Sequence, residues 1–107
     1  LKVGRHIRPD KHFKVIIARE EGEARFLQGY KKQYDTLKTT SHSGPLALID
    51  GQVTEQELQL AARIVARYCK GRLEDSVTLD YQNKAGEIKS LSVSPMPADE
   101  MPKNWIL

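Results

Sequence analysis

Two groups of positively charged side chains in this sequence have a spacing that would let them bind one ligand together. Arg63, Arg67 and Lys70 are spaced i, i+4 and i+7, which places all three on one side of a helix. Residues 1–19 add six Lys or Arg side chains against one Asp, although the whole chain carries only +3. Several cations on one rigid face bind a polyanion well, because each neutralised phosphate releases counterions. The pattern predicts a phosphate-binding surface if the two groups adjoin, and the competing interpretation is an ordinary solvated face.

Tyrosines could add stacking platforms for single-stranded RNA to such a surface. Tyr30, Tyr34 and Tyr68 are available, but each is expected in the core or at its rim. The sequence contains no RNP-like aromatic motif and no GXXG loop. The residues by themselves therefore give only a weak signal for RNA.

The three histidines predict no metal site, because a metal needs ligands that converge from fixed positions. The Pro-Asp pair at 9–10 is a turn signal. A two-residue turn there would set His12 opposite Ile7 and His6 opposite Phe13. The two rings would then point to different faces of the hairpin.

No arrangement of nucleophiles predicts an enzyme. Cys69 falls on the apolar side of a helix, where a thiol is usually a small, inert hydrophobic group. Ser41 and His42 are adjacent, but no acid is placed to orient the imidazole. Segment 43–45 lacks the glycines of a phosphate loop, and the glutamates within 20–23 suit a helix N-terminus. We expect no catalytic residue, no metal and no cofactor.

An α+β fold is expected to position these residues. Alternating apolar residues indicate strands, and a 3.6-residue period indicates helices. The expected strands span 2–8, 13–18, 34–40, 46–49, 76–82 and 87–94, and the expected helices span 20–30 and 54–70. The order β-β-α-β-β-α-β-β predicts an antiparallel sheet with two helices packed on it.

The second helix has the clearest pattern. Thr54 stands three residues before Glu57, which is the capping-box spacing. The apolar positions that follow fall within about 100° of one another at 3.6 residues per turn. They are Leu58, Ala61, Ala62, Val65 and Cys69. This helix is expected to bury a stripe of small residues and to expose the three cations on its opposite side.

Length and composition indicate one domain. The 107 residues, 39% hydrophobic and 29% charged, suffice for a single core. A single cysteine excludes an internal disulfide, and the longest apolar run is 4 residues against about 20 for a membrane span. We expect a domain over residues 1–94 and an extended, proline-rich tail over 95–107 that residues 105–107 hold against it. Because the chain opens directly in a strand-like pattern, we expect it to be part of a longer protein.

Four segments together resemble the NFACT-R type of RNA-binding domain. They are KVGRHIR at 2–8, IIAREEGEA at 16–24, GPLAL at 44–48 and AARIVARYCK at 61–70. They are most similar to the variant at the C-terminus of PP-loop ATPases that look like tRNA thiolation enzymes, of the 2-thiouridylase and 4-thiouridine synthase kinds. The resemblance covers nearly the whole chain in the same order.

The sequence departs from this family pattern at a few positions. Arg19 matches, but Glu20 and Ala24 replace two asparagines of the family. The glycine-proline loop matches at 44–45, and the tyrosine-serine-basic run matches at 68–70 with cysteine in place of serine.

The resemblance implies a non-catalytic accessory module that helps the catalytic PP-loop domain of the same chain to hold tRNA in the cytoplasm. The PP-loop signature, of the Ser-Gly-Gly-x-Asp-Ser type, does not occur in these residues. The expected phosphate contacts are Arg5, Arg8, Lys14, Arg19, Arg63, Arg67 and Lys70. His42 with the loop of Gly44 and Pro45 is expected at the sugar-phosphate edge.

Two other functions stay open. The module could dock the parent enzyme to itself or to a sulfur donor through the sheet edge and the tail. Cys69 could instead carry sulfur.

Overall fold

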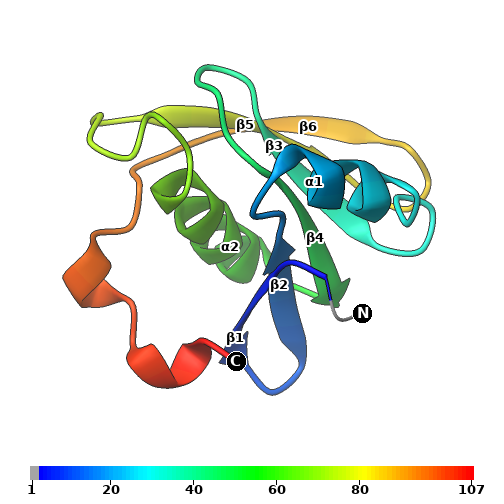
Figure 1. Ribbon diagram of the computed structural model, residues 1–107, viewed down its shortest axis with the longest axis horizontal. Coiled ribbons are helices and arrows are strands. Elements are labelled where there is room, and N and C mark those ends of the chain that lie inside the picture. The colour runs from blue at the N-terminus through cyan, green and yellow to red at the C-terminus, as the bar shows by residue number, and fades with distance from the viewer. Residues whose placement is uncertain (1–2) are drawn as a thin grey trace.

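The computed structural model describes residues 3–107 and has the expected order of elements (Figure 1). The strands are β1 (Arg5–Asp10), β2 (Phe13–Ile17), β3 (Asp35–Thr39), β4 (Leu46–Gly51), β5 (Val77–Gln82) and β6 (Ile88–Val93). The helices are α1 (Glu21–Gln28), α2 (Glu55–Arg67) and the short 3-10 helices η1 (Ala98–Glu100) and η2 (Lys103–Trp105). The predicted α+β class is confirmed. Within residues 3–107 no helix has the length and apolarity that a membrane crossing requires.

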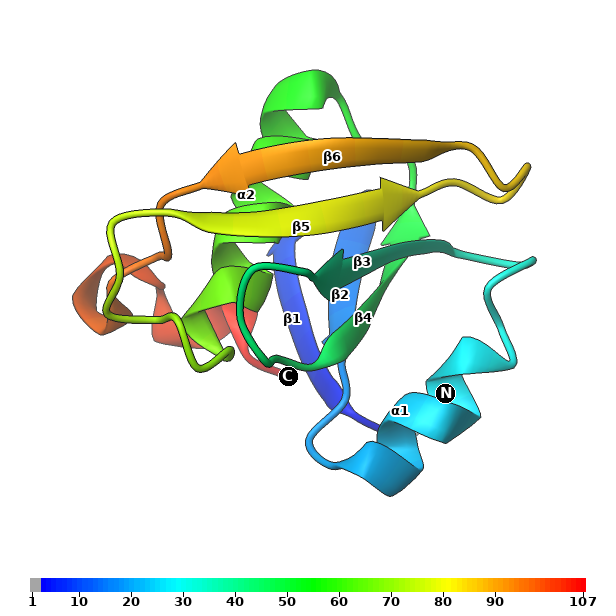
Figure 2. The ribbon, with the colours of Figure 1, turned by 90° about the horizontal axis from the view of Figure 1, so that it is seen from above.

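One antiparallel sheet holds all six strands in the order β1-β2-β4-β3-β5-β6. Side chains alternate between its faces, as a strand requires. Phe13, Val15 and Ile17 join the core cluster under α2, whereas Ile16 joins a smaller cluster under α1. The two helices therefore pack on opposite faces of the sheet. The sheet twists so strongly that β1 and β2 run across the direction of β5 and β6 (Figure 2).

Helix α2 begins as predicted. The Glu57 N–H donates to Thr54 Oγ1 at 3.2 Å, and the Thr54 N–H donates to Glu57 Oε1 at 2.9 Å, so the capping box is confirmed. The predicted apolar stripe is buried. The helix ends at Arg67 rather than Lys70, because the Lys70 N–H donates to the Ser43 carbonyl at 2.7 Å instead of continuing the helix. Lys70 therefore lies beyond the helix, and the prediction of three cations on one helix is wrong for this residue.

The first hairpin differs from the prediction. Residues 9–10 belong to β1, and residues 11–12 form the turn. Proline is tolerated in β1 because this strand lies at the edge of the sheet and carries an irregularity between Ile7 and Asp10. The Asp10 carboxylate accepts the Lys11 N–H at 2.6 Å, which stabilises the later turn.

Residues 95–107 return to the outer edge of β1, where the chain ends (Figure 1). Ile106 forms a bridge with Ile7, and the Leu107 N–H donates to the His6 carbonyl at 3.0 Å. Met96 is buried in the core under α2. The tail therefore covers the β1 edge, whereas the outer side of β6 has no partner strand among residues 3–107.

Candidate nucleic-acid interface

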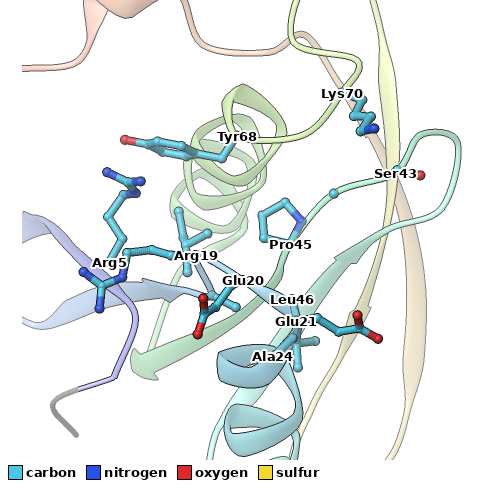
Figure 3. A pocket seen from close by; sticks show the side chains of 13 residues that line it. Arg5, Arg19, Glu20, Glu21, Ala24, Ser43, Pro45, Leu46, Tyr68 and Lys70 are labelled. Carbon is cyan, nitrogen blue, oxygen red and sulfur yellow. The ribbon is translucent and has the colours of Figure 1, made fainter.

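A hollow of about 420 Å³ opens where β1 begins, β2 ends and β4 begins (Figure 3). Helix α1 starts beside it and α2 ends beside it. Ile17 and Ala18 in its lining are buried, whereas the charged lining residues are exposed. The hollow therefore has an apolar floor and a charged rim. The charged residues of this rim are Arg5, Arg19, Glu20, Glu21 and Lys70.

An arginine–tyrosine contact joins the first hairpin to the end of α2. The guanidinium carbon of Arg5 lies 4.9 Å from the centre of the Tyr68 ring, and that of Arg67 lies 5.8 Å from it. Both distances fall within the range of a cation–π interaction. Figure 3 shows the Arg5 side chain pointing toward the ring. Arg5 of the first hairpin and Arg67 of α2 thus meet at one aromatic side chain, that of Tyr68. Lys70 lines the same hollow.

The Gly44 loop is held directly against the turn that follows α2. A Cβ atom at Gly44 would lie 2.5 Å from Cβ of Cys69 and 2.5 Å from Oγ1 of Thr39, so only glycine fits without a shift of these neighbours. The Lys70 N–H bonds to the carbonyl of the adjacent Ser43. These contacts fix Lys70 beside the loop at one wall of the hollow.

His42 lies on the other side of this loop. Its ring packs on Gly71, where a Cβ atom would come within 2.6 Å of it, and its Nδ1 lies 2.8 Å from Oγ of Ser41. His42 lines a second, shallower hollow that shares Ser43 and Gly44 with the first. The structure therefore places His42 beside the predicted surface and Gly44 and Pro45 within it.

Arg19 lines the hollow but is engaged by a carboxylate. Its Nη2 lies 2.9 Å from Oε2 of Glu23 and its Nε 3.2 Å from Oε1, which also accepts the Arg19 N–H at 2.8 Å. These bonds from Arg19 lower the pKa of Glu23 to about 2. Arg19 therefore contributes an ion pair to the rim rather than an uncompensated positive charge.

The remaining predicted cations lie outside this hollow. Arg63 faces the tail, where it donates to the Ser94 carbonyl at 3.0 Å and pairs with Glu100 at 3.3 Å. Arg8 donates to a carbonyl of the hairpin turn, and Lys14 lies on β2 toward that turn. Of the cations expected on one basic surface, Arg5 and Lys70 line the hollow and Arg67 lies over the Tyr68 ring, whereas these three residues do neither.

The first two histidines lie elsewhere than predicted. His6 is opposite Ile16 rather than Phe13, and His12 lies in the turn rather than opposite Ile7, because the turn forms two residues later. Burial, with a further contribution from nearby cations, lowers the pKa of His6. His6 therefore adds little positive charge to the surface at neutral pH.

His12 forms a cluster with two carboxylates that the sequence pattern did not predict. Its Nε2 lies 2.6 Å from Oε2 of Glu57, and its Nδ1 lies 3.2 Å from Oδ1 of Asp10. The Glu57 hydrogen bond raises the pKa of His12, and the same bond lowers the pKa of Glu57. Each residue offers a ligand atom within 4.8 Å of the others, but a metal needs a neutral imidazole and these carboxylates favour imidazolium. The cluster acts as an ionic link between the hairpin turn and the start of α2.

Tyr68 lines the hollow, although the sequence suggests it only as an available stacking residue and not as one of the predicted contacts. Spacing rules did not indicate it, because its role depends on Arg5 approaching from a distant strand. The available signal was its position directly after Arg67, at the end of the basic helix. Cys69, the next residue, is buried and accepts the Gly71 N–H at 3.2 Å.

Comparisons with known proteins agree with this architecture. No curated protein matches the chain. Among solved structures, the C-terminal part of the fibronectin/fibrinogen-binding protein from Streptococcus suis is similar, with a TM-score of 0.79 and 17% identity. The match covers 100% of this chain and 50% of that one, so the chain spans half of that relative's length and shares its fold. The family model described as the NFACT protein RNA binding domain matches residues 4–106. The chain therefore belongs to the NFACT protein RNA-binding domain family.

Proposed function

We propose that this domain binds tRNA at the hollow beside Tyr68 and serves a cytoplasmic, PP-loop, ATP-dependent tRNA-modifying enzyme of the thiolation type. The observation that carries the proposal is the contact of Arg5 and Arg67 with the Tyr68 ring, at a hollow that Arg5 and Lys70 both line. RNA as the ligand class follows from the family. The tRNA and the parent enzyme rest on the resemblance of the four sequence segments described above.

The chemistry of the hollow suits an RNA backbone that is not buried in a duplex. Arg5 and Lys70 are exposed and make no ion pair among residues 3–107, so their charges are available to phosphate. Tyr68 is only partly buried, and the guanidinium of Arg5 lies over its ring. An arginine already resting on the ring is preorganised, which reduces the entropy lost when RNA binds.

Binding to bulk tRNA, measured by fluorescence anisotropy at about 50 mM salt, tests the proposal. Lys70→Glu reverses a charge at the hollow and should weaken binding by about tenfold or more, because a phosphate contact becomes a repulsion. Lys84→Glu is the matched control, since Lys84 is an exposed lysine in the β5–β6 turn, outside the hollow. Equal losses for the two variants would contradict a site at the hollow, and no binding by the unmodified protein would contradict the function.

The parent enzyme is tested in cells. Deleting this domain from the full-length protein should lower the 2-thiouridine or 4-thiouridine content of bulk tRNA, measured by liquid chromatography and mass spectrometry. The Lys84→Glu full-length protein should restore the modified nucleoside, and the Lys70→Glu protein should restore much less. Unchanged levels of both nucleosides after the deletion would contradict a role of this domain in tRNA thiolation.

One observation favours the docking alternative. The outer side of β6 carries no partner strand among residues 3–107, and Ile88 at its start is 64% exposed. An open edge of this kind can accept a strand from another protein. Mass photometry of the full-length protein with and without the domain separates the functions, since loss of oligomer with intact tRNA binding favours docking.

A further inference from the structure

The charges around the hollow are divided between two sides. Arg5 and Lys70 belong to β1 and to the turn after α2, whereas Glu20 and Glu21 stand at the start of α1. Glu21 pairs with Arg25 at 3.2 Å, outside the hollow. Phosphate is attracted to the first side and repelled by the second. These charges would orient a nucleotide in the hollow, with its backbone phosphates on the side of Arg5 and Lys70 and its base toward α1.

Glu20 is a carboxylate at that rim without an ion pair among the described residues. It is the N-cap residue of α1, but its side chain makes no capping hydrogen bond. The neighbouring Arg19 forms its ion pair with Glu23 instead. Figure 3 shows the Glu20 carboxylate at the hollow, on the side away from Tyr68. Both of its oxygens are available to accept hydrogen bonds from a ligand.

The floor between these two sides suits a flat ring. Ile17, Ala18, Pro45 and Leu46 supply its apolar surface, and a volume of about 420 Å³ lies within the range of small-molecule sites. A base lying on this floor would turn its edge toward the start of α1. The identity of that base then depends on which edge a carboxylate binds best.

A carboxylate accepts two hydrogen bonds side by side, and guanine offers the matching pair. Its Watson–Crick edge carries N1–H next to the N2 amino group. Adenine and cytosine place a ring-nitrogen acceptor beside their amino group, and uracil places its single N3–H between two carbonyl oxygens. These acceptors repel a carboxylate. In a duplex both guanine donors are used in pairing, so only an unpaired guanine presents them.

We infer that the hollow binds an unpaired guanine nucleotide of the RNA, with the base edge on Glu20 and neighbouring phosphates of the backbone on Arg5 and on Lys70. This inference rests on the proposed RNA-binding function and adds the base that the site selects. Glu20, one of the two departures from the family's asparagines, is then a specificity residue of this chain.

Fluorescein-labelled RNA decamers test the inference by anisotropy on the 107-residue protein. Each decamer is oligouridine with a central G, A, C, U or inosine. The G decamer should bind about fivefold to tenfold more tightly than the A, C and U decamers, at the lower end of the discrimination of a bidentate contact because Glu20 is exposed. Inosine lacks the N2 amino group and should lose most of that preference.

Two variants assign the preference to one carboxylate. Glu20→Gln keeps the size of the side chain and should reduce the G preference to less than about twofold, without weakening the all-U decamer, because a charge that repels phosphate is removed. Glu74→Gln is the matched control, since Glu74 is exposed and lies outside the hollow. It should keep the full preference. A G preference that survives Glu20→Gln overturns the inference.

The outcomes separate this inference from the proposed function. Equal binding of all decamers, or binding of bulk tRNA with no binding of any decamer, overturns the guanine site and leaves tRNA binding intact. Absence of binding to both tRNA and decamers overturns the proposed function. An NMR titration with guanosine monophosphate should shift the backbone amides of residues 18–24 and of Ser43, Gly44 and Leu46, and shifts confined to the hairpin turn would overturn the location.

Discussion

The sharpest prediction concerns which cations set the salt dependence of RNA binding. Each single-stranded phosphate that a cation neutralises contributes roughly −0.7 to the slope of log K against log salt. Arg5, Arg67 and Lys70 make no ion pair among residues 3–107, so the unmodified protein should show a slope of about −2. The double variant Arg5→Gln, Lys70→Gln keeps only Arg67 and should show a slope of about −0.7.

The control removes the same charge from residues that the sequence pattern also predicted as contacts. Arg8→Gln, Arg63→Gln leaves the hollow intact, because Arg63 is bound to the tail and Arg8 to the hairpin turn. Its slope should stay near that of the unmodified protein. The assay is anisotropy with labelled tRNA between about 25 and 200 mM salt. If both double variants flatten the slope equally, binding is spread over the whole basic surface and the localisation to the hollow is refuted.

Three further predictions concern the scaffold. Gly44→Ala should lower the free energy of unfolding by about 1–3 kcal/mol in urea, because its Cβ meets that of Cys69 at 2.5 Å, whereas Gly22→Ala in α1, with no atom nearer than 3.7 Å, should raise it by about 0.5–1 kcal/mol. His12 has a folded pKa above 6.5, so the stability from its pair with Glu57 is present below pH 6.5 and is lost as pH rises through the raised value. The free energy of unfolding should therefore fall more between pH 6 and 8 in the unmodified protein than in His12→Gln. Parallel pH profiles of the two proteins would contradict a stabilising pair between His12 and Glu57. Cys69 is 1% exposed and should react with iodoacetamide only after unfolding, whereas rapid native labelling would revive a sulfur-carrying role.

The elements that the sequence predicted well are those whose signals are local. The capping box and the periodic apolar stripe of α2 lie within consecutive turns of one helix, and both are present. The first hairpin was mispredicted because Pro9 is an equally good signal for a turn and for an edge-strand irregularity. Only the position of β1 at the edge of the sheet decides between them, and that position depends on contacts with distant residues.

The site was only partly predictable for the same reason. The pairing of Arg19 with Glu23 has i, i+4 spacing and could have been anticipated, which would have removed Arg19 from the expected phosphate contacts. The pairing of Arg63 with Glu100 spans 37 residues and has no local signal. The approach of Arg5 to Tyr68 likewise requires β1 to start beside the end of α2.

Ion pairing explains how a domain with a net charge of only +3 can present a localised anion site. The structure pairs Arg19, Arg25, Arg63 and Lys89 with glutamates, and these pairs are largely exposed. Exposed pairs of this kind contribute only about 0–1 kcal/mol each to stability. Their larger effect is on the electrostatic field, because each pair cancels a positive charge that would otherwise attract phosphate away from the hollow. Breaking a distant pair, for example with Glu100→Gln, should therefore strengthen non-specific RNA binding and leave the guanine preference unchanged, whereas a loss of that preference would show that the field, and not the Glu20 carboxylate, selects the base.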